Sequence, residues 1–269
     1  MRRGFNCIEL IVVVLVIAVL VVLLLPAVSK VRHKAAVLKC NNRLRELGIG
    51  LHHHRDTFGH FPPGTVPSAA LPPDRRLSWC VALLPFIEQQ AAFDRFNPAA
   101  GCDAPANATA AKALPPTAFT CPGYPGPRPD LPVTNYVGVA GVGADAAALP
   151  FGAPGVGFFG YDRQLKLEHI KDGTAQTIAV TETGWDVGSA VRGGPSTVRG
   201  LDLSDEPLTG EGRPFGGLHR RDRFFGTAPL GVQVLMADGS VRLSAVRVDP
   251  FVLGALATIA GGEDIPANW

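Results

Sequence analysis

The chain has 269 residues, 46% of them hydrophobic, and a formal net charge of +2. This length suits one globular domain with an anchor, or two small domains, and it allows a substantial hydrophobic core. The near balance of charge excludes the strongly basic surface that is typical of nucleic-acid-binding proteins. The 31 Gly and 24 Pro residues predict a loop-rich fold with short elements.

An uncharged apolar run extends from Leu10 to Val28. A helix of about 19 residues, at about 1.5 Å per residue, spans roughly the hydrocarbon core of a bilayer. The run therefore predicts a transmembrane helix. Glu9 lies at its start, where a carboxylate is unfavourable in lipid and is usually functional. A signal peptide cleaved after Ser29 and a plain signal anchor remain as alternatives.

The residues before and within this run form an ordered pattern. They are Arg2, Arg3, Gly4, Phe5 and Glu9, with Pro26 near the end of the run. The pattern resembles the prepilin-type cleavage and methylation segment of type IV pilins and type II secretion pseudopilins. The resemblance implies that a prepilin peptidase cuts between Gly4 and Phe5, and that the new amine of Phe5 is methylated. It also implies that Glu9 pairs with that amine on a neighbouring subunit during assembly, and that Pro26 kinks the helix.

The apolar spacing continues beyond the run. Leu44, Leu47 and Leu51 recur at intervals of three to four residues among charged side chains, which predicts an amphipathic helix that ends between Arg55 and Gly59. The chain then divides into a leader at 1–4, a transmembrane helix at 5–28, an amphipathic extension at 29–58 and an extracytoplasmic α+β domain at 59–269.

The remaining elements are short. In chain order we expect a loop at 61–73, a buried helix at 77–96 broken at Pro85, an irregular stretch at 98–132, strands at 134–141 and 177–182, a hairpin at 231–246 around Asp238 and Gly239, and a helix at 249–260. The expected fold class is α+β and pilin-like, with a long N-terminal helix packed on a loop-rich antiparallel β-sheet.

Four cysteines follow the apolar run. If that region lies outside the cytoplasm, one or two disulfides are expected. Cys40 on the helix could pair with Cys121 in a Pro-rich loop, and Cys80 with Cys102. Buried free thiols are the alternative, because the sequence does not fix the connectivity.

Several blocks along the chain carry a second resemblance. "SWCVALLPFIEQ", "NYVGVAG", "IKDGTAQTIAVTE" and "VLMADGSVRL" are similar to the bacterial prepilin-like family that bears the domain of unknown function 1559, also called the H-x9-DG family. The resemblance implies a pilin-like anchor with a large extracytoplasmic domain. Here His219 lies farther from Asp238 than the family spacing, which indicates a tolerated loop before the hairpin.

Metal and nucleotide motifs are weak. A run of three histidines, His52 to His54, could bind a metal, since His52 and Asp56 share a helix face. No third ligand is evident, so we interpret these histidines as surface or packing residues. The acidic stretch 202–211 has oxygen ligands at intervals plausible for Ca²⁺ but matches no calcium-loop motif. Those acidic residues are Asp202, Asp205, Glu206 and Glu211. Gly155–Gly160 spells G-x-G-x-x-G without the strand and helix that a dinucleotide site needs.

These patterns together predict a prepilin-like subunit rather than an enzyme, with no required cofactor. It would lie in the bacterial inner membrane with a single span and assemble into a pseudopilus or pilus-like structure. The expected partners are the prepilin peptidase, other pilin-like subunits and membrane lipid, and no nucleic acid. The alternative is a monomeric, membrane-tethered module that binds envelope glycan or protein.

Overall fold

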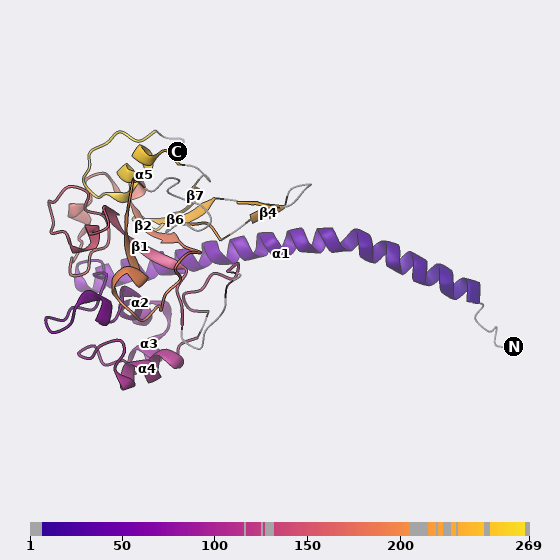
Figure 1. Ribbon diagram of the computed structural model, residues 1–269, viewed down its shortest axis with the longest axis horizontal. Helices are drawn as coiled ribbons and strands as arrows, with labels where there is room; N and C mark the ends of the chain where they lie inside the picture. Colours follow the sequence, from indigo (N-terminus) through magenta and orange to yellow (C-terminus); the bar gives the residue numbers. More distant parts are fainter. Residues whose placement is uncertain are drawn as a thin grey trace.

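The structure is a computed structural model in which a long helix projects from a head of mixed secondary structure (Figure 1). It describes residues 7–115, 117–124, 126, 132–204, 215–218, 220–222, 227–229, 231–244 and 248–266. Side chains are described in these ranges except at 23, 25–27, 29, 30, 33, 220–222 and 227–229.

The long helix, α1, runs without interruption from Cys7 to Phe58. At about 1.5 Å per residue it is roughly 78 Å long. Gly59 follows it with a φ of +80°, and the Gly59 N–H donates to the Arg55 carbonyl at 2.7 Å. This left-handed residue satisfies an open carbonyl and turns the chain away, which ends the helix.

Within the part of the chain that the structure describes, no helix combines the length and the apolar character needed to cross a membrane.

Short helices pack beside the end of α1. The predicted broken helix is present as α2 (Trp79–Leu83), the 3-10 turn η2 (Leu84–Ile87) and α3 (Gln90–Phe93). One further helix, α4 (Pro105–Lys112), lies in the stretch that the sequence predicted to be irregular. The other 3-10 turns are η1 (Pro73–Arg75), η3 (Ala146–Ala148), η4 (Leu167–His169), η5 (Thr174–Gln176) and η6 (Gly194–Ser196).

The head is built on a five-stranded sheet with the order β3-β1-β2-β6-β7. Its strands are β1 (Tyr136–Val142), β2 (Ile178–Glu182), β3 (Val198–Leu201), β6 (Val232–Met236) and β7 (Val241–Ser244). The sheet is mixed rather than antiparallel throughout, because β3 pairs in parallel with β1, whereas its other pairings are antiparallel as expected. The chain leaves β2, passes β1 and adds β3 at the far edge, so β3 takes the direction of β1.

A separate two-stranded ribbon pairs β4 (Arg220–Asp222) with β5 (Thr227–Pro229). Figure 1 shows this ribbon projecting from the head in the same direction as α1.

Two helices cover opposite faces of the sheet (Figure 1). Side chains alternate along each strand. Leu235 on β6 joins the core on the α1 side, whereas its neighbours Val234 and Met236 join the core beneath α5 (Pro250–Ala257). Helix α5 begins where the Asp249 carboxylate accepts the Phe251 N–H at 2.8 Å. The central strands β1, β2 and β6 are therefore buried on both faces, whereas the edge strand β7 is partly exposed.

Candidate functional site

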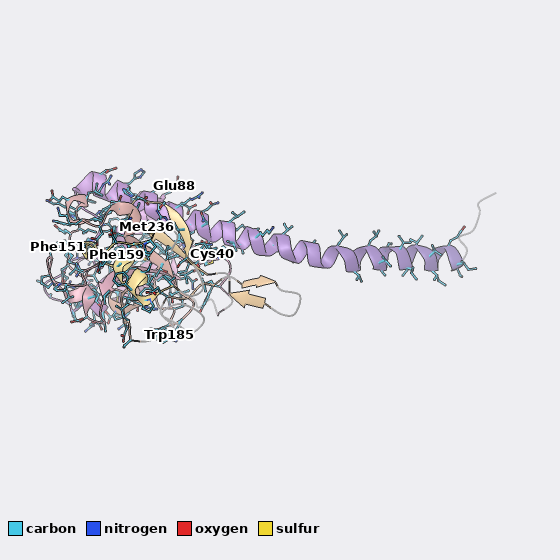
Figure 2. All side chains as sticks on the ribbon, turned by 90° about the horizontal axis from the view of Figure 1, so that it is seen from above. Cys40, Glu88, Phe151, Phe159, Trp185 and Met236 are labelled. Atoms are coloured by element: carbon cyan, nitrogen blue, oxygen red, sulfur yellow. A yellow bond between two sulfur atoms is a disulfide. The ribbon has the colours of Figure 1, made fainter. Side chains whose placement is uncertain are left out.

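The first half of α1 exposes large apolar side chains (Figure 2). Among the described positions between Ile8 and Val31, the exposed fraction of these side chains runs from 45% at Val28 to 68% at Ile8. An exposed apolar surface of this extent marks contact with lipid or with another protein. This part of the helix is a candidate functional surface.

Glu9 is exposed in the first turn of α1, among apolar neighbours. A carboxylate at this end of a helix interacts favourably with the helix dipole. Gly4 and Phe5 lie outside the described residues, so leader cleavage stays a prediction. The backbone of α1 continues through residue 26, but the side chain of Pro26 lies outside the described part, and its kink is also untested.

The second half of α1 is seated in the head. Cys40, Leu44 and Leu47 are fully buried. A Cβ atom added at Gly50 would lie 2.9 Å from the Ile87 Cγ2 atom, and one at Gly48 would lie 2.9 Å from the Leu235 Cδ1 atom. Glycine at these two positions lets the helix approach η2 and β6 closely.

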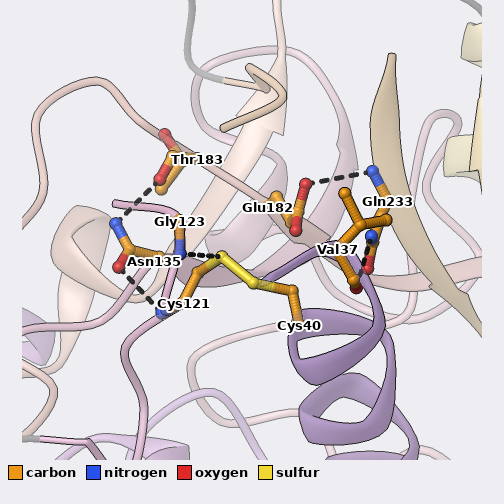
Figure 3. Close-up of a disulfide and its surroundings, with 8 residues drawn as sticks. All are labelled: Val37, Cys40, Cys121, Gly123, Asn135, Glu182, Thr183 and Gln233. Atoms are coloured by element: carbon orange, nitrogen blue, oxygen red, sulfur yellow. Dashed lines mark hydrogen bonds between the residues drawn. A yellow bond between two sulfur atoms is a disulfide. The ribbon is translucent and has the colours of Figure 1, made fainter. Parts of the chain in front are cut away.

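A disulfide fastens α1 to the loop after α4 (Figure 3). It joins Cys40 to Cys121 with a Cα–Cα distance of 5.3 Å, and both residues are fully buried. The Gly123 N–H donates to the Cys121 sulfur at 3.3 Å. This bridge closes a loop with a sequence separation of 81 residues.

The second expected bridge, Cys80–Cys102, is wrong. Both residues are free cysteines. Cys80 is fully buried in the helical core, where burial raises the pKa of its thiol. Cys102 is only partly buried in the loop before α4, with its Sγ turned toward the Asp74 carbonyl at 3.9 Å. The two thiols therefore lie in different environments, one in the core and one near the surface.

A buried acid lies beside the disulfide. Glu182, at the end of β2, is fully buried and accepts backbone N–H groups from Gln233, at 3.2 Å, and from Leu218. Burial raises the pKa of Glu182 to about 8, and those hydrogen bonds only partly oppose the shift. Burial, and then the nearby Glu182 charge, raise the pKa of Tyr136, the cross-strand neighbour on β1.

Gln233 connects this acid to α1. Its side-chain Nε2 donates to the Val37 carbonyl at 3.2 Å, while its backbone N–H meets Glu182 (Figure 3). The disulfide and this polar link hold the same stretch of α1 to the head. We call the residues Val37, Cys40, Cys121, Glu182 and Gln233 the junction.

The junction also contains the single group of potential metal ligands found in the described part of the chain. The sulfurs of Cys40 and Cys121 and a carboxylate oxygen of Glu182 all lie within 4.8 Å of one another.

The sequence analysis singled out neither Glu182 nor Gln233. For Gln233 the available signal was a polar residue that interrupts an apolar strand, whereas Glu182 follows Thr181 at the end of its strand and gives no such signal.

The histidine run and the acidic stretch considered as metal ligands in the sequence form hydrogen bonds or ion pairs with residues close by in the chain. His54 is buried and its Nδ1 lies 3.0 Å from the His60 carbonyl, and Asp56 pairs with Arg55 at 2.5 Å. Asp202 accepts both the N–H and the hydroxyl of Ser204. The other acidic residues of this stretch, Asp205, Glu206 and Glu211, lie outside the described residues.

The H-x9-DG spacing cannot be traced as a pair, because His219 lies outside the described residues. Asp238 sits in the β6–β7 turn, where its carboxylate accepts the Ser240 N–H at 2.8 Å. Gly239 follows with a φ of +86°, as such a turn requires. The Asp-Gly pair thus shapes the hairpin.

A family model described as "Protein of unknown function (DUF1559)" matches residues 29–213. The chain belongs to the DUF1559 family. The match includes four of the five junction residues, namely Val37, Cys40, Cys121 and Glu182. Residues 7–28 of α1 and the β6–β7 hairpin fall outside the matched DUF1559 residues. Neither a curated protein nor a solved structure matches the chain significantly.

Proposed function

We propose that this DUF1559 protein is a prepilin-like subunit that is anchored in the bacterial inner membrane and assembles into a pseudopilus or pilus-like structure. The observation that carries the proposal is the exposed apolar surface of α1 between Ile8 and Val31. A helix that is apolar on all sides needs a covering of lipid or of other helices. The structure describes the side chains of the run from Leu10 to Val28 except at 23 and 25–27. The sequence shows that this whole run is uncharged.

The chemistry of assembly follows from the N-terminal residues. Cleavage between Gly4 and Phe5 would free an amine, and methylation would leave that amine cationic. Glu9 lies near this new end, in surroundings that become apolar once the helix is covered. A carboxylate is unfavourable in apolar surroundings, so a cationic amine from a neighbouring subunit would stabilise it.

The mature N-terminus tests this proposal. Mass spectrometry of the membrane fraction should find a chain that begins with N-methylated Phe5. A chain that begins at Met1 has kept its leader, and one that begins at Lys30 has lost the apolar run. Either result contradicts the proposal.

The role of Glu9 has its own test. Glu9→Ala should leave cleavage intact but strongly reduce incorporation into any filament. Glu46→Ala is the matched control, because Glu46 is also an exposed acid on α1 but lies beside the head. Equal assembly of both variants would contradict the assigned role of Glu9.

A membrane-tethered binding module is the second candidate, and one feature favours it. An open, mainly apolar groove of about 600 Å³ lies at the C-terminal end of α1, opposite the projecting end, with Phe58, Phe86 and Phe93 in its wall. Grooves of this size suit a small ligand or a short stretch of polymer. Chemical cross-linking in cells distinguishes the two functions, since the binding module yields monomers only.

A further inference from the structure

We propose that Cys40, Cys121 and Glu182 form a zinc site when the Cys40–Cys121 bridge is reduced. This site is independent of whether α1 assembles with other copies. It would hold the helix to the head in the chain that has not yet been oxidised.

The geometry of the three ligand atoms supports the site. They lie within 4.8 Å of one another and come from α1, the loop after α4, and β2. Zinc binds sulfur at about 2.3 Å and carboxylate oxygen at about 2.1 Å, so its tetrahedral ligands lie roughly 3.3–3.8 Å apart. Opening the disulfide lets the two sulfurs separate toward this spacing, while the Cα–Cα distance of 5.3 Å keeps them near one ion.

The surrounding hydrogen bonds are of the kind that orient metal ligands. The Gly123 N–H already points at the Cys121 sulfur, and the Gln233 N–H points at a Glu182 oxygen. Donors of this kind stabilise a thiolate and a carboxylate and fix their directions. Two thiolates with one carboxylate favour zinc over magnesium or calcium, which prefer oxygen ligands.

The charge of the site also fits a cation. Cys40, Cys121 and Glu182 are fully buried, where unpaired negative charges are unfavourable. A divalent ion neutralises most of the charge that two thiolates and a carboxylate would bring. The Gln233 side-chain oxygen is buried with no hydrogen-bond partner in the described structure, so the same region also offers an unused polar atom.

Reduction opens the bridge before zinc binds. A phosphine or dithiol reductant gives two electrons, the Cys40–Cys121 S–S bond breaks, and each sulfur takes one proton. Zinc then displaces the protons of both thiols and of the Glu182 carboxyl group, and three protons leave to solvent for each zinc bound. Oxidation by a disulfide reverses the sequence, because forming the bridge removes two of the three ligands.

Zinc titration of the full chain in detergent tests the site. After reduction with tris(2-carboxyethyl)phosphine, the protein should bind about one zinc per chain, as a three-ligand site requires. The oxidised protein should bind none at the same zinc concentration. Cobalt(II) provides a spectroscopic probe, because coordination by two thiolates gives a near-ultraviolet band that the oxidised chain should lack.

Variants assign the ligands. Cys40→Ser and Cys121→Ser should each abolish the cobalt band, and Glu182→Gln, which retains the bridge before reduction, should weaken zinc binding at least tenfold. The matched control is the Cys80→Ser/Cys102→Ser double variant, which removes the two free thiols of the head and should bind zinc like the wild type.

Several outcomes would overturn the proposal. They are the absence of zinc binding in the reduced wild type, its persistence in the Cys40→Ser/Cys121→Ser variant, and its loss in the Cys80→Ser/Cys102→Ser control. Circular dichroism of the same samples covers the case in which reduction unfolds the head. Recovery of the fold on adding zinc supports the site, and failure to recover contradicts it.

Discussion

The two halves of α1 place leucine side chains in opposite environments. Leu20 in the first half is 52% exposed, whereas Leu47 in the second half is fully buried against the head. The second half alternates apolar and charged residues at helical spacing, so one stripe faces the core. The first half is apolar on every side, so no single face of the head could cover it. The head thus buries one face of the second half, whereas the described residues of the first half between Ile8 and Val31 stay exposed.

The largest expected effect concerns the bridge that fixes the second half. Replacing both Cys40 and Cys121 with Ser should lower the free energy of unfolding by about 4 kcal/mol, because the bridge restrains a long loop in the unfolded chain. Denaturant unfolding of the full chain in detergent measures this. Cys102→Ser is the control and should change stability by less than about 0.5 kcal/mol. Equal effects would mean that the bridge does not secure the helix.

A matched pair of leucines separates the two environments directly. Leu47→Ala should cost about 3 kcal/mol, because it leaves a cavity in the packed core. Leu20→Ala removes the same atoms from an exposed position and should leave the unfolding of the head unchanged within about 0.5 kcal/mol. The same denaturation assay applies to both. A comparable loss for Leu20→Ala would show that the first half also packs within its own chain.

The buried acid at the junction predicts a pH dependence. Burial raises the pKa of Glu182 from 4.5 to about 8, so the folded chain keeps a proton that the unfolded chain has already lost. The contribution of Glu182 to the free energy of unfolding is therefore fully present below about pH 4.5 and is lost as the pH rises to about 8, by up to about 1.4 kcal/mol for each pH unit.

The Glu182→Gln variant should lose most of this pH dependence, because its amide has no proton to release and its carbonyl can still accept the Gln233 N–H. Unfolding measured at pH 5 and pH 8 in both proteins tests this. A wild-type chain that gains stability toward pH 8 would show that Glu182 is ionised in the folded state.

The smallest expected effect lies on the solvent face of the second half. Arg43 and Glu46 form an ion pair of 2.6 Å at partly exposed positions of α1. Such pairs contribute little, so Arg43→Ala should cost only about 0.3–0.5 kcal/mol. High salt should remove even that difference in the denaturation assay. A loss above about 1 kcal/mol would mean that this face is packed more tightly than its exposure indicates.

Local signals explain which elements the sequence predicted. The end of α1 follows from Gly59, and the β6–β7 hairpin follows from the Asp238-Gly239 turn between two β-rich runs. The break at Pro85 is equally local. In each case the residues that decide the element lie within a few positions of it.

Long-range pairing explains what was missed. β3 finds β1 across the sheet, and nothing in its four residues encodes a parallel partner. The α4 helix was hidden by the Pro- and Ala-rich composition around Pro105, although proline suits the first turn of a helix. The environment of Glu182 arises only when α1, β2 and β6 come together, so the sequence could not indicate its burial.

Cysteine cross-linking in cells tests most directly whether other subunits cover the first half of α1. In a chain with Cys7→Ser, Val14→Cys places a thiol on the exposed first half, and Ile49→Cys places one on the exposed face of the second half. The account predicts that oxidation links Val14→Cys chains into dimers in the membrane and leaves Ile49→Cys chains mostly monomeric. Monomers alone at Val14→Cys, with Phe5 established as the mature N-terminus, would contradict assembly through this helix.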